Sequence, residues 1–534
     1  MKAEPSVLRD FTVDRRVWLL SGVAIGIGVV ATGLAVLLLK AIALSTNLFY
    51  YHRWSIASVS PAGSPLGYWM VAVPIVGGLI VGLMARFGSD KIRGHGIPEA
   101  IEAILLNRAR VQPKLAILKP ISAAIAIGSG GPFGAEGPII MTGGAAGSLV
   151  AQWMHVTDAE RTTLLVAGAA AGMSATFATP VAAILLAVEL LLFEWRPRSL
   201  VPVALASATA GLLRVFWLGA GPLFAMPSLP EGHALLFALG ALGLGAVMGL
   251  AAAGLSRIMY AFEDLFERLP LHWMWWPALG GLGVGLGGLF FPRGLGVGYD
   301  NIAQLLAGKA TLALIVGILV AKSLMWASSL GSGTSGGVLA PLLMIGGAAG
   351  ALAAHLLHAA PEVQAFWALL GMGSMLAGAL GVPMTAILFS VEVTHCLPAL
   401  LPLTLACVAS YLVTSLLTPR SILTEKLSRR GFHLSREYGV DPLELVVVRD
   451  LMTPLPEDTS VGELPEVYTF ADGTARGAAE IMSTEGLTTL PVVDRASGTV
   501  CGTLSIQDLL RGRGQSIQRE RQRLRLFRHA APER

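Results

Sequence analysis

The amino-acid sequence predicts an all-α membrane protein with broken helices, followed by a small α/β module. Composition is the first observation: 54% of the 534 residues are hydrophobic and 13% are charged, against roughly 25% charged residues in an ordinary soluble domain. The second observation is a duplication within the apolar part of the chain. The third is a change after residue 431, where charges return every few residues and apolar runs shorten to the length of strands.

Long apolar stretches account for the membrane prediction. Several approach the ~20 residues that cross a bilayer as a helix, while others are shorter or interrupted by glycine and proline. The stretches are Val17 to Leu44, Trp69 to Ala85, Leu235 to Leu255, Leu312 to Val320, Gly337 to Leu357 and Leu397 to Leu417. Because the first is long and further apolar stretches follow it, we do not expect it to be a cleaved signal peptide.

The duplication has a constant spacing of 203 residues. The segments "GSGGPFGAEGPIIMTGGAAGSLVAQ" from Gly128 and "GSGTSGGVLAPLLMIGGAAGALAAH" from Gly331 are identical at 13 of 25 positions without a gap. A second pair of segments, "TPVAAILLAVEL" and "VPMTAILFSVEV", matches at the same spacing and aligns Glu189 with Glu392. Two matches at one offset predict a membrane domain built from two related halves.

In both copies a glycine-rich segment is followed by proline, two apolar residues and methionine, which predicts a loop that leads into a helix. Helices that begin within the bilayer direct unsatisfied N–H groups and positive dipole ends at the interface between repeats. Non-helical backbone is tolerated at that depth only where it is buried or lines a wet cavity. Two such helix starts facing each other predict an anion site, and the "GGAAG" runs at 143–147 and 346–350 suit close helix packing.

Three loops resemble the signature loops of the CLC chloride channels and anion–proton antiporters. They are "GHGIPEA" (Gly94 to Ala100), "GSGGPFGAEGP" (Gly128 to Pro138) and "GGVLAP" (Gly336 to Pro341), and their order and spacing match that family. The resemblance covers roughly Val17 to Gly431. It implies a homodimer of inverted repeats with a separate pore in each subunit.

The resemblance also implies roles for individual residues. Glu136 matches the gating glutamate, whose carboxylate occupies an anion site and swings away, or is protonated, to let an anion pass. Lys119 matches a basic residue that raises the local positive potential. The anion-binding positions in the matching loops, including the backbone amides of the third loop, are His95, Gly96, Gly134, Gly137, Val338 and Leu339.

Three pore positions depart from the family's pattern. His95 replaces a common serine that contacts the central anion, Leu339 replaces a common phenylalanine, and Leu423 aligns with the pore tyrosine that binds the anion. With both usual hydroxyl ligands absent, backbone N–H groups would have to replace more of the water molecules that the anion loses when it enters the pore. His95 would donate through a ring N–H or as a cation. The anion preference therefore stays open.

A further departure concerns protons. Where antiporters of the family carry an internal glutamate that passes protons toward the gate, this chain has Leu190. A leucine carries no proton, which favours an uncoupled channel, or coupling by another route through Glu189 or Glu194. Because Glu189 recurs in the other half as Glu392, we expect both to be structural, for example as caps of backbone N–H groups.

The module after the membrane domain resembles a single CBS motif. The matching segments are "VRDLMTP" from Val448 and "GAAEIMSTEGLTTLPVVDRASGTVCGTLSIQDLL" from Gly477. They predict a helix at about Ala475–Ser483, strands at Thr489–Val493 and Val500–Ser505, and a second helix that starts directly after the second strand.

CBS motifs normally work in pairs, and some bind adenine nucleotides. Ser505 and Asp508 match the hydroxyl and the ribose-contacting acid of the nucleotide-binding versions. Because one copy is found, we expect the two copies of a homodimer to pair across the two-fold axis as a structural cap. Adenine-nucleotide binding is the alternative.

Charge and cysteine usage narrow the class further. Basic residues precede the first apolar stretch and enrich the tail, so the positive-inside tendency places both termini in the cytoplasm, at a cell inner membrane or plasma membrane. The three cysteines form no disulfide framework and no metal spacing. With no nucleophile–base pair or phosphate loop, we expect neither an enzyme nor a required cofactor or metal, and no nucleic-acid partner.

The expected function is transport of a small anion, chloride first, through a glutamate-gated, channel-like pore in each subunit. Proton-coupled anion antiport is the alternative within transport. From another class, the alternative is an anion- or nucleotide-sensing membrane scaffold. The expected parts are a cytoplasmic N-terminus (1–16), the transport domain (17–431, with halves at about 17–217 and 235–417), the CBS module (432–512) and a solvated basic tail (513–534).

Overall fold

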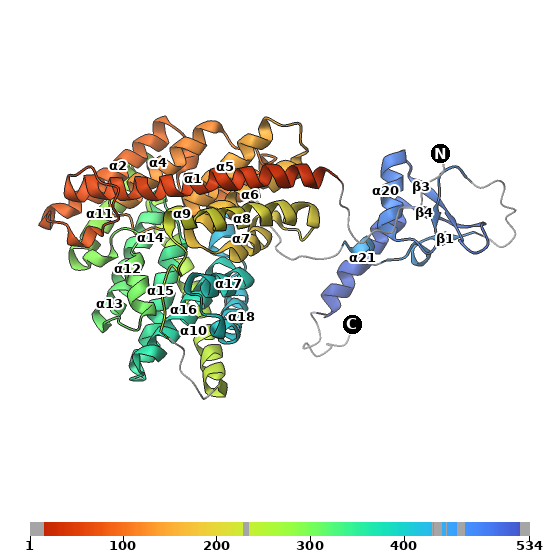
Figure 1. Ribbon diagram of the computed structural model, residues 1–534. Helices are drawn as coiled ribbons and strands as arrows, with labels where there is room; N and C mark the ends of the chain where they lie inside the picture. The colour runs from red at the N-terminus through yellow and green to blue at the C-terminus, as the bar shows by residue number, and fades with distance from the viewer. Residues whose placement is uncertain are drawn as a thin grey trace. The chain divides into compact units, whose positions relative to one another are not determined.

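The computed structural model describes residues 15–227, 234–429, 431, 441–444, 446–455 and 465–523. These residues belong to two compact units, one within residues 11–435 and the other within residues 436–534. The first unit is helical and the second combines helices with a small sheet (Figure 1). Most of the predicted N-terminal segment and the last part of the predicted tail lie outside the described residues.

The first half of the helical unit contains long helices and several short or interrupted ones. α6 begins with a capping box, in which Thr157 accepts from Glu160 N while Glu160 accepts from Thr157 N. The elements are α1 (Arg16–Tyr51), α2 (Ala72–Phe87), α3 (Ile97–Leu106), α4 (Pro113–Gly128), α5 (Glu136–Gln152), α6 (Asp158–Phe177), α7 (Pro180–Leu186), the π-helical η4 (Ala187–Leu192), α8 (Pro197–Leu213) and α9 (Val215–Leu218).

The second half repeats this order. α5 and α15 begin at Glu136 and Leu339, and the difference, 339 − 136, is 203 residues. The elements are α10 (Ala234–Glu267), α11 (Trp276–Phe290), α12 (Tyr299–Leu306), α13 (Leu312–Gly317), the π-helical η7 (Ile318–Lys322), α14 (Ser323–Gly331), α15 (Leu339–Leu356), α16 (Pro361–Leu380), α17 (Pro383–Thr394), α18 (Leu400–Leu417) and α19 (Ile422–Arg429). The duplication predicted from the sequence is therefore a duplication of structure.

Eight helical segments of the described residues are long and apolar enough to cross a membrane. These segments differ in how far the rest of the protein buries them. The apolar window of Pro361–Leu380 is 83% buried within the unit, whereas that of Arg16–Tyr51 is 39% buried. α16 therefore lies in the protein interior. α1 covers one side of the unit with an apolar outer face, as a lipid-facing helix does (Figure 1).

Small residues set the closest helix contacts. A Cβ added to Gly143 of α5 would lie 2.2 Å from the carbonyl oxygen of Gly168 in α6. In the second half, a Cβ on Gly346 of α15 would lie 2.4 Å from the carbonyl oxygen of Gly371 in α16. Both glycines belong to the "GGAAG" runs, so the prediction that these runs pack helices closely is confirmed.

The second unit contains a four-stranded sheet in the order β1-β4-β3-β2. β3 pairs antiparallel with β4, and β2 pairs parallel with β3. Buried side chains of Leu490, Val492 and Leu504 pack against Ala478 and Met482. The elements are β1 (Thr453–Pro454), β2 (Thr469–Phe470), α20 (Ala475–Glu485), β3 (Thr489–Val493), β4 (Val500–Ser505) and α21 (Ile506–Arg523).

Both predicted long strands of this unit are confirmed at their predicted bounds, and the second helix starts directly after β4. α20 runs to Glu485, two residues beyond the predicted end, because Gly486 supplies the left-handed C-cap (φ 67°). α21 continues to Arg523, so residues 513–523 of the predicted tail continue this helix.

Candidate functional site

Two helix starts meet at the interface between the repeats. Gly134 precedes α5 and Gly337 precedes α15, and the two residues form an antiparallel bridge. Gly337 N donates to Gly134 O at 2.9 Å, and Gly134 N donates to Gly337 O at 3.3 Å. Since 337 − 134 is 203, the bridge joins equivalent positions and lies on the local two-fold axis that relates the halves.

The Glu136 carboxylate lies against this bridge. The side chain is fully buried. A Cβ on Gly134 would lie 1.7 Å from its Oε2 atom, and a Cβ on Gly337 would lie 2.6 Å from the same atom. Oε2 has no hydrogen-bond partner among the described residues. The carboxylate therefore occupies the space directly before α15, where a negative charge is favoured by the helix dipole.

The first turn of α15 supplies free donors. The amides of Leu339 and Ala340 belong to its first residues and have no acceptor within the helix. Val338 is the N-cap residue, and its carbonyl accepts the first intrahelical bond, from Leu342 N at 3.2 Å. The structure thus places Val338 and Leu339 where the sequence predicts amides that face an anion.

The first signature loop contacts α5 through backbone. A Cβ on Gly137 would lie 1.7 Å from the carbonyl oxygen of His95, and a Cβ on Gly96 would lie 2.4 Å from the carbonyl oxygen of Gly137. Gly96 also has φ 92°, which favours glycine, and it caps α3. The glycines of "GHG" and "EGP" are therefore required by the close approach of two helix starts.

His95 lies at the inner surface of a cavity of about 780 Å³. Its side chain is 3% exposed, and Nδ1 has no hydrogen-bond partner among the described residues. The cavity is lined by both halves, α10 and α19, with five carboxylates and five basic side chains. Because these charges balance, the cavity lining adds little net charge, and the helix starts supply the positive potential near Glu136.

Lys119 is fully buried and does not pair with Glu136. Its Nζ donates to the carbonyl oxygens of Ile92 and Gly94, both at 2.8 Å, and so holds the loop that leads into α3. The sequence analysis missed its counterpart in the second half, Lys322. Its Nζ donates to Gly296 O at 2.7 Å and holds the loop that leads into α12. The 203-residue offset could have identified it.

Glu99 lines the cavity and links the first signature loop to α19. It accepts from Gly96 N at 2.8 Å and forms an ion pair with Lys426 of α19 at 2.8 Å. Leu423, on the same helix, is fully buried. Tyr260 holds α19 by donating to the carbonyl oxygen of Ile422 at 2.6 Å. The residue that the sequence analysis aligns with the family's pore tyrosine is therefore a buried apolar side chain; its contact with an anion stays a prediction.

Tyr299 is a second residue that the sequence analysis missed. It begins α12, and its Oη lies 3.5 Å from Glu136 Oε1. Its ring contacts Phe177 and Phe224 edge to face, at centroid distances of 6.3 and 6.0 Å. The sequence signal is a tyrosine in a glycine-rich segment, "GLGVGYD", shortly before the third signature loop.

Glu189 and Glu392 each cap the start of a helix in the opposite half of the domain. Glu189 accepts from Met384 N at 3.1 Å and Thr385 N at 2.9 Å, at the start of α17. Glu392 accepts from the equivalent amides of α7, those of Val181 and Ala182, at 3.0 and 2.8 Å. The structural role expected from their symmetry is confirmed.

Replacing Glu392 or Glu189 with alanine is expected to lower the free energy of unfolding by about 1–2 kcal/mol, because each change leaves two helix-start amides without an acceptor. Thermal unfolding of the purified protein in detergent measures this loss. The glutamine variants, which retain one acceptor oxygen, should lose less. Equal stability of wild type and both alanine variants would contradict a capping role.

Glu194 lies beyond this pair, at the start of α8. It accepts from Ser199 and forms ion pairs with Arg196 at 3.4 Å and Arg198 at 3.3 Å. Both carboxylates named as an alternative proton route therefore have structural partners. The route itself stays a prediction.

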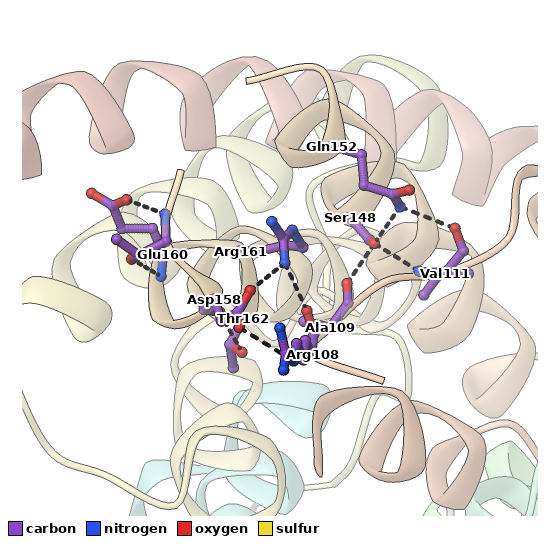
Figure 2. Close-up of polar contacts among 10 residues, drawn as sticks. Arg108, Ala109, Val111, Ser148, Gln152, Asp158, Glu160, Arg161 and Thr162 are labelled. Atoms are coloured by element: carbon purple, nitrogen blue, oxygen red, sulfur yellow. Dashed lines mark hydrogen bonds and ion pairs between the residues drawn. The ribbon is translucent and has the colours of Figure 1, made fainter. Parts of the chain in front are cut away.

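The far end of α5 is held by polar contacts (Figure 2). Ser148 donates to Ala109 O at 2.6 Å and accepts from Val111 N at 3.0 Å. Arg161 of α6 donates to Arg108 O at 3.1 Å and to Asp158 at 2.6 Å. These contacts fix the loop between α3 and α4, which lines the cavity, to α6 and to α5, the helix that carries Glu136.

In the second unit, Ser505 and Asp508 form the cap of α21. Ser505 N and Oγ donate to Asp508 at 2.9 and 2.7 Å, and Arg511 pairs with the same carboxylate. Burial raises the pKa of Asp508, but the hydrogen bonds from Ser505 and the charge of Arg511 outweigh it and hold the pKa below its ordinary value. Asp508 is 3% exposed, so its side chain has a structural role in capping α21.

The fold and this site define an anion-transport membrane protein. Residues 77–415 match the model of the voltage-gated chloride channel family. The chain is 30% identical over 375 residues to a putative chloride channel protein ClcB-like of Ralstonia nicotianae, covering 68% of this chain and 87% of the relative. It is 31% identical over 393 residues to the H(+)/Cl(-) exchange transporter ClcA of Vibrio campbellii, covering 69% and 82%. The chain belongs to the voltage-gated chloride channel (CLC) family.

Solved structures show the same fold. A slow cyanobacterial Cl-/H+ antiporter aligns with a TM-score of 0.68 and 22% identity, covering 78% of this chain and 99% of that one. A CLC-type fluoride/proton antiporter aligns with a TM-score of 0.65 and 21% identity, covering 77% and 98%. The chain is accordingly a multi-pass membrane protein of the CLC fold and not an enzyme.

Proposed function

We propose that this protein transports chloride through a pore in each subunit and that the Glu136 carboxylate gates the pore. One observation carries the proposal: the buried carboxylate lies directly before the start of α15, against Gly134 and Gly337. A small anion would be favoured at that place by the same free amides and dipole. The carboxylate and the anion therefore compete for one position.

We propose a channel-like mode. Leu190 occupies the position of the internal proton-carrying glutamate of the resembled antiporters, and its side chain is fully buried in the π-helical segment η4. Glu189 and Glu194, the nearby carboxylates, are engaged with helix-start amides and with arginines. With both carboxylates engaged in these contacts, the residue at the position of the antiporters' proton route is the apolar Leu190.

Proton-coupled chloride antiport is the second candidate. It is supported by the names of related proteins, which include an H(+)/Cl(-) exchange transporter and a Cl-/H+ antiporter. In this mode Glu136 would be protonated from the cavity that His95 lines, through His95 or water, because Leu190 cannot take part.

Chloride efflux from liposomes with simultaneous proton recording tests the proposal. We expect chloride efflux without stoichiometric proton movement. Uphill proton movement driven by a chloride gradient would replace the channel mode with antiport. Correctly folded protein that conducts no anion would instead support the scaffold alternative, in which the site senses anions without passing them.

We expect His95 to contact the transported anion through a ring N–H of the neutral imidazole, because burial lowers the pKa of this side chain and opposes its protonation. The measurement is chloride flux against pH in Glu136→Ala and in His95→Ser/Glu136→Ala, so that the gate's own protonation is removed from both profiles. We expect neither profile to rise between pH 8 and pH 5. A rise in the first variant that the second variant lacks would show instead that His95 becomes a cation beside the anion.

The proposed function also includes an oligomeric state and a location in the membrane. We propose a homodimer in an inner or plasma membrane with cytoplasmic termini, in which the two CBS modules pair. The single α/β motif among the described residues supports pairing between subunits. Because Ser505 and Asp508 cap α21, we favour a structural cap over adenine-nucleotide binding; nucleotide titration of the purified protein would test this choice.

A further inference from the structure

The loops of the two halves differ most where the pore chemistry lies. Glu136 corresponds to Leu339 at the 203-residue offset. Tyr299 begins α12 after the N-cap Gly298, as Ile97 begins α3 after the N-cap Gly96, so the counterpart of Tyr299 is Ile97. Each pair therefore carries a polar side chain in one half and none in the other. The two polar members meet, with Tyr299 Oη 3.5 Å from Glu136 Oε1. Symmetric contacts such as the Gly134–Gly337 bridge build the scaffold, whereas this contact exists once in each subunit.

The ring of Tyr299 is held on two sides. Phe177, at the end of α6, and Phe224 both contact it edge to face. Phe224 is itself fixed, since its N–H donates to the carbonyl oxygen of Val393 at 3.1 Å. Both phenylalanines are buried. The hydroxyl is therefore presented to Glu136 by packing that does not depend on the hydroxyl itself.

The backbone before Tyr299 is fixed as well. Gly298 has φ 79° and caps α12. Asn301 donates to Arg293 O at 2.8 Å, and Lys322 donates to Gly296 O at 2.7 Å. The buried lysine thus positions the loop that carries Tyr299, because it contacts carbonyl oxygens two and three residues before the tyrosine.

We propose that Tyr299 is the hydroxyl ligand of the anion position that Glu136 occupies. When the carboxylate lies at this position, Tyr299 donates its O–H to it and stabilises the closed gate. When the carboxylate leaves, the same O–H donates to the chloride that replaces it. A neutral phenol suits both acceptors, because each is monovalent and lacks a donor. Tyr299 thereby supplies the hydroxyl that is absent at His95 and Leu423. This inference rests on the proposed function.

The distance of 3.5 Å is long for a hydrogen bond between two oxygens. A bond of this length contributes little to holding the carboxylate, so we expect a gate that opens readily. A bound halide would sit on the same side of the hydroxyl. The rival explanation is that Tyr299 only packs against Phe177 and Phe224.

Tyr299→Phe separates these explanations, because phenylalanine keeps the ring and loses the hydroxyl. Chloride flux and calorimetric chloride binding would be measured for wild type, Tyr299→Phe, Glu136→Ala and the double variant. We expect Tyr299→Phe to increase flux about threefold in the wild-type background, by releasing the gate. In the Glu136→Ala background we expect it to weaken chloride binding about five- to tenfold.

Tyr51→Phe is the matched control. It removes a tyrosine hydroxyl that donates to the carbonyl oxygen of Ser60 at 2.6 Å, outside the three signature loops, and it should leave chloride affinity unchanged. Unchanged chloride binding in Tyr299→Phe/Glu136→Ala would overturn the inference and leave Tyr299 a packing residue. If Glu136→Ala itself left flux unchanged, the gate proposal would fail, while the calorimetric comparison would still decide the role of Tyr299.

Discussion

Alanine in place of Glu136 is expected to raise chloride flux at neutral pH about tenfold and to remove the pH dependence that protonation of the carboxylate causes. A tenfold gain corresponds to about 1.4 kcal/mol of closed-state stabilisation. The physical reason is competition: the carboxylate occupies the space before α15 against Gly134 and Gly337. In the wild type, acid pH neutralises the carboxylate and flux rises as pH falls. In the variant no carboxylate competes.

The measurement is chloride efflux from liposomes between pH 5 and pH 8, with Glu136→Gln as the companion variant. Glutamine preserves the shape of the side chain without its charge, so it separates electrostatic competition from steric block. High flux in both variants indicates that charge holds the gate closed. High flux in the alanine variant alone indicates that bulk does. Unchanged flux in Glu136→Ala would contradict the gate assignment.

Alanine at Gly137 is expected to prevent folding, whereas alanine at Gly134 is expected to fold and to open the pore. Both added methyl groups would lie 1.7 Å from an existing oxygen. At Gly137 that oxygen is the His95 carbonyl, which belongs to the backbone that starts α3 and cannot move without separating the two helices. At Gly134 it is Glu136 Oε2, the far end of a side chain that can swing away.

Size-exclusion chromatography and thermal unfolding in detergent measure the first half of this prediction, and chloride flux measures the second. Gly137→Ala should yield aggregated protein. Gly134→Ala should yield folded protein with flux close to that of Glu136→Ala, and adding Glu136→Ala to it should change little. A folded Gly137→Ala, or a Gly134→Ala with wild-type flux, would show that the backbone contacts are looser than the structure has them.

Much of the fold could be predicted because membrane segments follow from local composition. Apolar length identifies spanning helices, and the 203-residue offset identifies the duplication without any contact being known. The strands at 489–493 and 500–505 were predicted from the resemblance of this segment to a CBS motif. The position of Glu136 at a helix start likewise followed from the glycine-rich loop around it and its apolar counterpart in the other half.

Other features could not be predicted because they depend on which distant segments meet. Nothing within either segment pairs Tyr299 with Glu136, since the contact spans 163 residues and its partners differ between the halves. The exchange of caps by Glu189 and Glu392 also requires the halves to face each other. Even Lys322, which the offset could have identified, has a role only once the carbonyl groups it contacts are in place.

The sequence by itself determined the class of protein, the repeat, the loops that begin helices within the membrane and the place of Glu136 in one of them. These properties are local, because hydrophobic length, glycine content and helix-start chemistry act over a few residues at a time. Only the tertiary structure decided which helix start the Glu136 carboxylate lies against and which hydroxyl it meets. The two halves bring their helix starts together on a common axis, so the proposed anion position belongs to neither half alone.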